Sequence, residues 1–109
     1  MELIERDELK AKLDRADDFK LVMMLNEWAY NAMHISGSIN IFTPDKAKDE
    51  LDPDDEIVVY CSNEACMASV IGYQALKDAG YEHVRRYAGG LVDWQEAGYP
   101  LDGERARKS

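Results

Sequence analysis

The sequence predicts a single α/β domain whose core is a largely parallel β-sheet. Strand-like and helix-like segments alternate along its 109 residues, and no repeat or low-complexity stretch interrupts them. The β-branched run Ile57-Val58-Val59 is typical of a buried central strand, and the helical pattern that follows it ends at Gly80. Because a chain of this length supports one modest hydrophobic core, we expect one domain over residues 1–103 and a polar C-terminal tail over residues 104–109.

The first elements are a predicted helix and a predicted strand. Leu9 and Leu13 lie four positions apart among charged residues, which favours an amphipathic helix over residues 6–14. Residues 19–25 form an apolar run that suits a buried strand, although its leucines and methionines would also fit a helix.

The middle of the chain predicts two short helices separated by a strand. Asn26 is a suitable N-cap for a helix over residues 27–33, which we expect to present Trp28 to the core. Residues 38–42 predict a short strand, and Pro44 then stands at the first position of another helical turn.

The second half of the chain contains the clearest elements. Residues 56–60 predict the central strand, and the apolar positions of residues 66–79 fall near helical spacing. A further strand is predicted over residues 81–87 and a last helix over residues 91–97. We expect Trp94 to anchor this last helix in the core.

Charge and hydropathy limit the partners and the location of the protein. Thirteen Lys and Arg against 22 Asp and Glu give a formal net charge of −9, which would repel the phosphate backbone of a nucleic acid. No apolar run has the length of a membrane span, and residues 1–15 do not form the apolar core of a signal peptide. We therefore expect a cytoplasmic protein, a monomer or weak dimer, with no nucleic-acid or membrane partner.

The position of one cysteine points to chemistry. Two cysteines and two histidines are too few for a disulfide scaffold or a common zinc site, so we expect neither a metal nor a cofactor. Cys61 follows the central strand and precedes a helix, at the sheet edge where open α/β folds bind ligands. Free backbone N–H groups and the helix dipole at this place should lower the pKa of a thiol and stabilise a thiolate or persulfide.

Four segments of the chain, in this order and spacing, resemble the rhodanese family. They are His34-Ile35-Ser36-Gly37-Ser38-Ile39-Asn40, Ile57-Val58-Val59-Tyr60-Cys61, Gly80-Tyr81 to Val84, and Gly89-Gly90-Leu91-Val92-Asp93-Trp94 to Gly98-Tyr99-Pro100-Leu101. The resemblance implies a rhodanese-like fold with a mostly parallel five-stranded sheet flanked by helices on both faces. It also implies a sulfurtransferase whose catalytic cysteine matches Cys61.

The chain departs from the family pattern at two places that bind anions. Where rhodaneses carry an Asp-x-Arg pair, this chain has Met23 and Leu25, and Cys66 stands at the position of the usual loop arginine. Loss of a charge-assisted hydrogen bond would cost about 1.5 to 3 kcal/mol, and Glu64 in the loop would repel a divalent anion. Thiosulfate is therefore expected to be a poorer sulfur donor than a neutral or protein-bound persulfide.

We expect Cys61 to accept a sulfane sulfur and to pass it to a thiol acceptor, for example on a protein. The residues expected to surround the persulfide, chiefly through small side chains and backbone N–H groups, are Ser62, Asn63, Glu64, Ala65, Cys66 and Met67. Cys66 is in addition a candidate resolving thiol that could attack a Cys61 persulfide, release hydrosulfide and leave a disulfide. Ser69 is expected to bond to a helix carbonyl, and His34 to be a partly buried histidine with its hydrogen bonds satisfied.

Three functions other than sulfur transfer are also compatible with the sequence. The chain could be a non-catalytic regulatory or binding module of the same fold, in which case Cys61 should react slowly. It could be a thiol redox sensor that uses Cys61 and Cys66. A phosphatase or arsenate reductase is less favoured, because residues 62–69 contain no Arg or Lys to bind the oxyanion.

Overall fold

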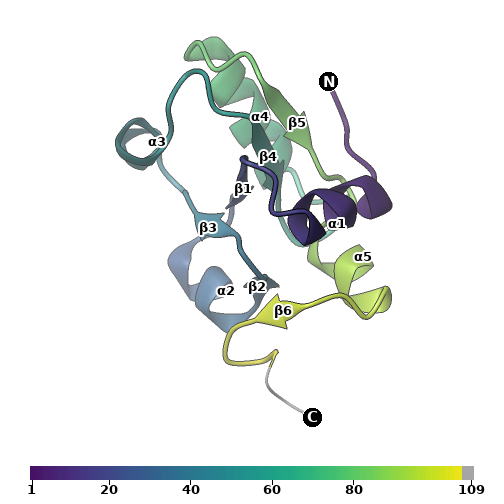
Figure 1. The fold of residues 1–109 in the computed structure, drawn as a ribbon. Coiled ribbons are helices and arrows are strands. Elements are labelled where there is room, and N and C mark those ends of the chain that lie inside the picture. Colours follow the sequence, from purple (N-terminus) through teal and green to yellow (C-terminus); the bar gives the residue numbers. More distant parts are fainter. Residues whose placement is uncertain (107–109) are drawn as a thin grey trace.

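The centre of the fold is a four-stranded, fully parallel sheet with the strand order β3-β1-β4-β5 (Figure 1). A computed structural model describes residues 1–106, without the side chain of Pro44. The strands of this sheet are β1 (Lys20–Met23), β3 (Ile39–Asn40), β4 (Ile57–Tyr60) and β5 (Val84–Arg86). The predicted α/β class and the central position of the β-branched strand are confirmed.

The expected fifth strand of the central sheet is not formed. Leu3 makes only an isolated parallel bridge to Arg86, because the first helix already begins at Arg6 and leaves too few extended residues for a ladder. A separate antiparallel pair is formed by β2 (His34–Ile35) and β6 (Leu101–Asp102).

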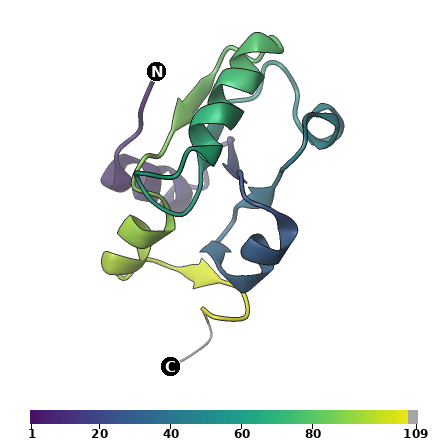
Figure 2. The same cartoon turned by 180° about the vertical axis from the view of Figure 1, so that it is seen from behind.

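Helices cover both faces of the sheet, as predicted. On one face lie α1 (Arg6–Asp14) and α5 (Gly90–Glu96), and on the other lie α3 (Pro44–Glu50) and α4 (Ala68–Asp78) (Figures 1 and 2). The short helix α2 (Glu27–Ala32) adjoins the β2–β6 pair. Within residues 1–106, none of these helices has the length and apolar character needed to cross a membrane.

The core consists of two hydrophobic layers separated by the sheet. Ile57 and Val59 of β4 pack with residues of α3 and α4, whereas Val58 and Tyr60 pack with residues of α1 and α5. All four side chains of β4 are fully buried, which explains why this segment is apolar at every position. Trp94 is only 1% exposed and anchors α5, as the sequence predicted.

One expectation about the chain around α2 is wrong. Trp28 does not enter the core: it is 71% exposed and stacks beneath the guanidinium of Arg105 at 5.7 Å. The start of the predicted tail is held against α2, because Glu104 N–H and Arg105 N–H donate hydrogen bonds to carbonyls of that helix. Residues 107–109 of that tail lie outside the described residues, and a domain end at residue 103 remains a prediction.

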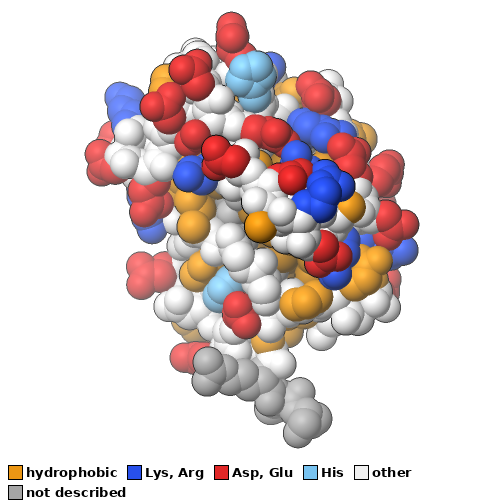
Figure 3. All heavy atoms as spheres, in the orientation of Figure 1, with side chains coloured by type: hydrophobic (Ala, Val, Ile, Leu, Met, Phe, Trp, Pro, Cys, Tyr) orange, Lys and Arg blue, Asp and Glu red, His pale blue; other side chains and the backbone are white. Residues whose placement is uncertain are grey.

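The molecular surface is predominantly acidic. Asp and Glu side chains are distributed over much of the face in Figure 3, with Lys and Arg between them. Several of the basic groups are held in ion pairs, such as Arg85 with Glu8 and Arg6 with Asp93. The net charge of −9 disfavours the binding of large anions.

The last residue of β4 connects the sheet to the β2–β3 turn through a buried hydrogen-bond network. The hydroxyl of Tyr60 accepts a hydrogen bond from Ile35 N–H at 2.9 Å and lies 2.8 Å from the hydroxyl of Ser38. Burial raises the pKa of Tyr60, so this hydroxyl stays protonated at neutral pH. The network holds the strand end that precedes Cys61.

We expect Tyr60→Phe to lower the free energy of unfolding by about 2 kcal/mol, because the N–H of Ile35 would be left buried without a partner. Tyr81→Phe is the matched control, since that buried hydroxyl contacts only two carbonyls at 3.4 and 3.5 Å. The control should change the free energy of unfolding by about 1 kcal/mol or less. Urea unfolding of both variants measures the difference. Equal losses of unfolding free energy would contradict the proposed contribution of the Tyr60 network to stability.

Candidate active site at the Cys61–Cys66 loop

The loop that carries both cysteines lies between the central strand and the helix that covers it. Cys61 directly follows β4, and α4 begins at Ala68, so the loop stands at the carboxyl end of the parallel sheet. This is the place that the sequence predicted for Cys61. Two N–H groups at the start of α4 act to lower the pKa of these thiols, that of Ser69 for Cys61 and that of Ala68 for Cys66.

The loop backbone is folded by hydrogen bonds of its own. The side-chain oxygen of Asn63 accepts from Ala65 N–H at 3.0 Å, and its carbonyl accepts from Cys66 N–H at 3.1 Å. The side chains of Asn63, Glu64, Ala65 and Met67 are exposed, whereas those of Ser62 and Cys66 are half-buried. The six residues from Ser62 to Met67 lie in one loop, and Cys66 is the partly accessible thiol of that loop.

Cys61 is more buried than the sequence led us to expect. It is 1% exposed, and its Sγ lies 3.2 Å from Ser69 Oγ and 3.5 Å from the Cys66 carbonyl oxygen. Burial raises the pKa of Cys61, and its hydrogen bond to the Cys66 thiol raises it further, while Ser69 lowers it only in part. The expectation that the helix terminus lowers this pKa is wrong, because desolvation outweighs the N–H groups.

The favourable environment for a thiolate belongs instead to Cys66. Partial burial opposes its ionisation, but the thiol of Cys61, the N–H groups of Ser62 and Ala68 and the Ser62 hydroxyl donate toward its sulfur and lower its pKa to about 7. The backbone N–H groups that we expected around Cys61 thus chiefly serve the second cysteine. At neutral pH the site combines an accessible thiolate with a buried, protonated thiol.

A buried arginine reaches the loop from the neighbouring strand. Arg86 of β5 is 7% exposed, and it donates from Nε to Ser69 Oγ at 2.9 Å and from one terminal nitrogen to the carbonyls of Glu64 and Cys66 at 3.2 and 3.4 Å. No carboxylate within residues 1–106 forms an ion pair with it. The loop therefore has a cationic neighbour, although residues 62–69 contain none.

The sequence analysis missed Arg86 and misread Ser69. Arg85 and Arg86 follow one another in a predicted strand, and successive strand residues point to opposite faces, so the pair itself indicated that one guanidinium turns inward. We expected the Ser69 hydroxyl to bond back to a helix carbonyl. It lies instead between Arg86 Nε and Cys61 Sγ and links these two side chains.

The positions that lack the family's Asp-x-Arg pair contribute to the core. Met23 is fully buried and Leu25 packs half-buried against the same hydrophobic layer. His34 is half-buried as predicted, with Nδ1 2.7 Å from the Tyr30 carbonyl and its ring stacked on Tyr30. Neither Met23 nor Leu25 carries a charge that could bind an anion.

The start of α5 supports the loop from the other side. Leu91 N–H donates to the Cys61 carbonyl at 3.0 Å, and Val92 N–H donates to the Ser62 carbonyl at 2.9 Å. This approach requires the absence of a side chain at Gly90, where a Cβ would lie 2.5 Å from the Cys61 carbonyl oxygen. The backbone of Cys61 and Ser62 is thus held by α5 while Arg86 holds Glu64 and Cys66.

We expect Arg86→Lys to lower the free energy of unfolding by about 1–3 kcal/mol, because one ammonium group cannot replace a fork that reaches three acceptors. Arg85→Lys is the control on the same strand, since its ion pair with Glu8 lies at the surface and should contribute about 1 kcal/mol or less. Amide hydrogen exchange should also become faster in residues 62–67 of the Arg86 variant only. Unchanged exchange there would contradict the role of Arg86 in holding the loop.

Comparisons with known proteins agree with this architecture. The family model described as rhodanese-like domain matches residues 5–97. The NMR structure of the rhodanese-like domain of Alr3790 from Anabaena sp. has a TM-score of 0.89 at 25% identity, covering 100% of this chain and 84% of that one. The BH2092 protein of Bacillus halodurans, at 20% identity, has a TM-score of 0.88 and coverages of 99% and 82%.

One further solved structure carries the name of an enzyme. The thiosulfate sulfurtransferase of Pseudomonas aeruginosa has a TM-score of 0.80 at 25% identity, covering 94% of this chain but only 20% of that protein. No curated protein sequence matches the chain. The family match over most of the length, together with the fold, shows that this chain belongs to the rhodanese-like domain family.

Proposed function

We propose that this protein transfers sulfane sulfur from a persulfide-type donor to a thiol acceptor, with Cys61 and Cys66 together as the reactive unit. The observation that carries the proposal is the contact of two free cysteines at the carboxyl end of the sheet, where Cys61 Sγ lies 3.5 Å from the carbonyl oxygen of Cys66. Family membership and the fold shared with a protein named thiosulfate sulfurtransferase support the reaction class.

Cys66 is the thiol that meets the donor in this proposal. Its accessible thiolate attacks the outer sulfur of R–S–SH, a new S–S bond forms on Cys66, and the donor leaves as the thiolate R–S⁻. No electrons are gained or lost overall, because one S–S bond replaces another. The low pKa of Cys66 makes the nucleophile available at neutral pH without a separate general base.

Cys61 is the thiol that holds the transferred sulfur. After the Cys66 persulfide has lost its proton to water, Cys61 attacks its outer sulfur, so that Cys66–S–S⁻ and the Cys61 thiol become Cys61–S–S⁻ and the Cys66 thiol. An anion at this buried position would lie beside the Ser69 hydroxyl and N–H, and one hydroxyl away from the guanidinium of Arg86. Return of the sulfur through Cys66 then delivers it to the acceptor.

The surroundings of the loop favour neutral or weakly charged donors over thiosulfate. Glu64 is exposed at the loop surface, Arg86 is occupied by the loop backbone, and the chain carries a net charge of −9. We also propose a cytoplasmic location, because both cysteines would stay reduced there.

Mass spectrometry after treatment with a persulfide donor tests this proposal. The parent protein should gain one sulfur atom, found on the peptide that contains Cys61. In Cys66→Ser, loading of Cys61 should be slowed about tenfold or more, because a buried thiol of raised pKa must then react directly. In Cys61→Ser, Cys66 should load rapidly but lose the sulfur to added thiol faster than the parent does.

Two outcomes would contradict the proposal at different points. Absence of any sulfur adduct on the parent with several donors would remove sulfur transfer and leave a non-catalytic module of the same fold. Equal loading rates of Cys61 with and without Cys66 would remove the division of roles between the two thiols.

A further inference from the structure

Three buried side chains from three parts of the fold form a series of contacts that ends at the Cys61 sulfur. Arg86 of β5 is 7% exposed, Ser69 of α4 is 1% exposed, and Cys61 of the loop is 1% exposed. Arg86 Nε donates to Ser69 Oγ at 2.9 Å, and Ser69 Oγ lies 3.2 Å from Cys61 Sγ. Because water is largely excluded from all three side chains, these contacts act in a low dielectric, which strengthens hydrogen bonds to a charged group.

The register of the sheet directs Arg86 toward α4. In the parallel pair of β4 and β5, Arg86 stands opposite Val59, which packs in the hydrophobic layer that contains residues of α4. Arg85 stands opposite Val58 and projects to the other face, where it pairs with Glu8 of α1. The two successive arginines therefore carry the same charge on the same strand, and Arg86 is the one that contacts the cysteine loop.

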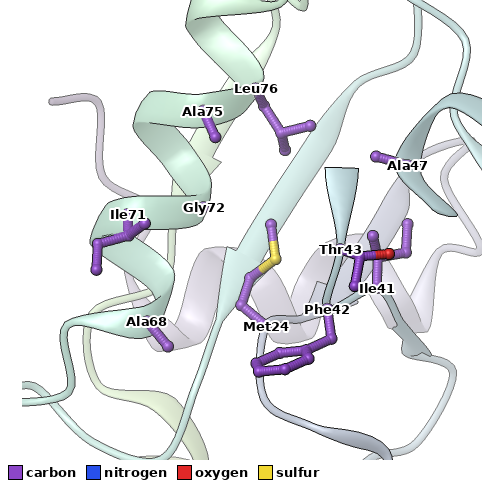
Figure 4. A pocket seen from close by; sticks show the side chains of 10 residues that line it. All are labelled: Met24, Ile41, Phe42, Thr43, Ala47, Ala68, Ile71, Gly72, Ala75 and Leu76. Carbon is purple, nitrogen blue, oxygen red and sulfur yellow. The ribbon is translucent and has the colours of Figure 1, made fainter. Parts of the chain in front are cut away.

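The first turn of α4 directs Ser69 toward this contact. An apolar cavity of about 270 Å³ lies along α4, where Ala68 and Gly72 line one wall and Thr43 lies on the opposite wall (Figure 4). Neither cysteine is among its lining residues, and neither is Ser69. The helix thus presents small apolar residues to the cavity and the Ser69 hydroxyl to Arg86 and Cys61.

The contact with Arg86 determines the direction of the Ser69 hydroxyl. The Nε–H of an arginine can only donate, so Ser69 Oγ accepts this hydrogen bond and its own hydrogen points away from Arg86. A thiolate carries no hydrogen, so an ionised Cys61 can only accept from this hydroxyl. Burial and the Cys66 thiol raise the pKa of Cys61, whereas the Ser69 hydroxyl lowers it. The loss of this one donor would leave the buried sulfur still harder to ionise.

We propose that Arg86 is a positioning residue for sulfur transfer, which holds the Ser69 hydroxyl as a donor to Cys61 so that this buried sulfur can carry negative charge. This inference rests on the proposed function and deepens it, because Cys66–S–S⁻ and the Cys61 thiol there become Cys61–S–S⁻ and the Cys66 thiol. Negative charge arrives at Cys61 in this step, and the proton of Cys61 moves to Cys66. Cys66 is the titratable neighbour of Cys61, and Arg86 is the cation one hydroxyl away.

The pH profile of Cys61 alkylation tests this role without any sulfur donor. Cys66→Ser leaves Cys61 as the only thiol, since the chain has two cysteines. Added to it, Arg86→Met should move the midpoint to higher pH by about one unit, or an about tenfold smaller thiolate fraction below the midpoint. Arg86→Lys, which keeps the cation, should move it less. Arg85→Met is the matched control: it removes a charge from the same strand and should leave the midpoint in place.

Ser69→Ala in the same background shows whether Arg86 acts through the hydroxyl. Alone it should raise the midpoint by a similar amount, and Arg86→Met should then add little further shift. Equal shifts from Arg86→Met with and without the hydroxyl would overturn the positioning role. A midpoint that falls in Arg86→Met would also overturn it, because a loosened loop would relieve the burial that raises the pKa of Cys61. If Arg86→Met does not fold, Arg86→Lys with and without the hydroxyl makes the same comparison.

Sulfur loading with Cys66 in place separates failure of this inference from failure of the proposed function. After treatment with a persulfide donor, sulfur should appear on the Cys61 peptide about tenfold more slowly in Arg86→Met than in Arg85→Met. Unchanged loading together with an unchanged alkylation midpoint in Arg86→Met would overturn the inference and leave the proposed function intact. The expected alkylation shifts without any sulfur adduct on the parent would overturn the proposed function and still support the control of the Cys61 thiol by Arg86.

Discussion

Iodoacetamide is expected to alkylate the parent protein at Cys66, with a half-maximal rate near pH 7. The pKa of Cys66 is lowered to about 7, so its thiolate is present above this pH and is lost as the pH falls below it. The pKa of Cys61 is raised above its ordinary value, and this residue is only 1% exposed. At pH 7, Cys66→Ser should therefore slow alkylation about tenfold or more, because the remaining thiol is buried and its pKa is raised.

Two substitutions of Cys61 provide the matched control for this prediction. Cys61→Ser keeps a hydrogen-bond donor beside the Cys66 sulfur, whereas Cys61→Ala removes it. The alkylation curve should consequently lie at higher pH in the alanine variant than in the serine variant. A parent curve centred near pH 9, or modification that reaches Cys61 first, would contradict the assignment of Cys66 as the accessible thiolate.

The sequence predicted those parts of the fold that local patterns determine. The strand β4 is apolar at each position because both of its faces are covered, and its β-branched residues were readable as a central strand. The helix α4 and the anchor Trp94 follow from helical spacing in the same way. The missing fifth strand could not be predicted, because it depends on how many residues remain between Leu3 and the start of α1.

The site was predicted in place but not in its electrostatics. The position of Cys61 after a central strand follows from element order, which the sequence carries. The conformation of the loop determines which of the two thiols is ionised. This conformation buries Cys61, which raises its pKa, and surrounds Cys66 with hydrogen-bond donors, which lowers its pKa. Arg86 lies 20 residues after Cys66 and joins the loop only because β5 pairs with β4. Contacts of this kind come from sheet register, which a motif within the loop does not contain.

Gly90→Ala is expected to produce the largest combined loss of stability and thiol reactivity. The new Cβ would lie 2.5 Å from the Cys61 carbonyl oxygen, 2.9 Å from the Ser62 carbonyl carbon and 3.0 Å from Asn63 N, all of them backbone atoms. Relief of the clash must separate α5 from the loop and break the hydrogen bonds that Leu91 and Val92 donate to it. We expect the free energy of unfolding to fall by about 2–5 kcal/mol, from backbone strain and overpacking together.

Gly98→Ala is the control that separates the cost of a positive φ from the cost of a collision between the new Cβ and the loop backbone. Gly98 has a φ of +75°, close to the +65° of Gly90, but a Cβ there would meet nothing within 4 Å. Its substitution should cost only about 1 kcal/mol and should leave the pH profile of Cys66 alkylation unchanged. In Gly90→Ala the profile should shift toward the ordinary thiol value of about pH 8.5, because Ser62 would no longer hold its N–H and hydroxyl against the Cys66 sulfur. If both variants lost the same stability and kept the parent profile, the close approach of α5 would not be what shapes the loop.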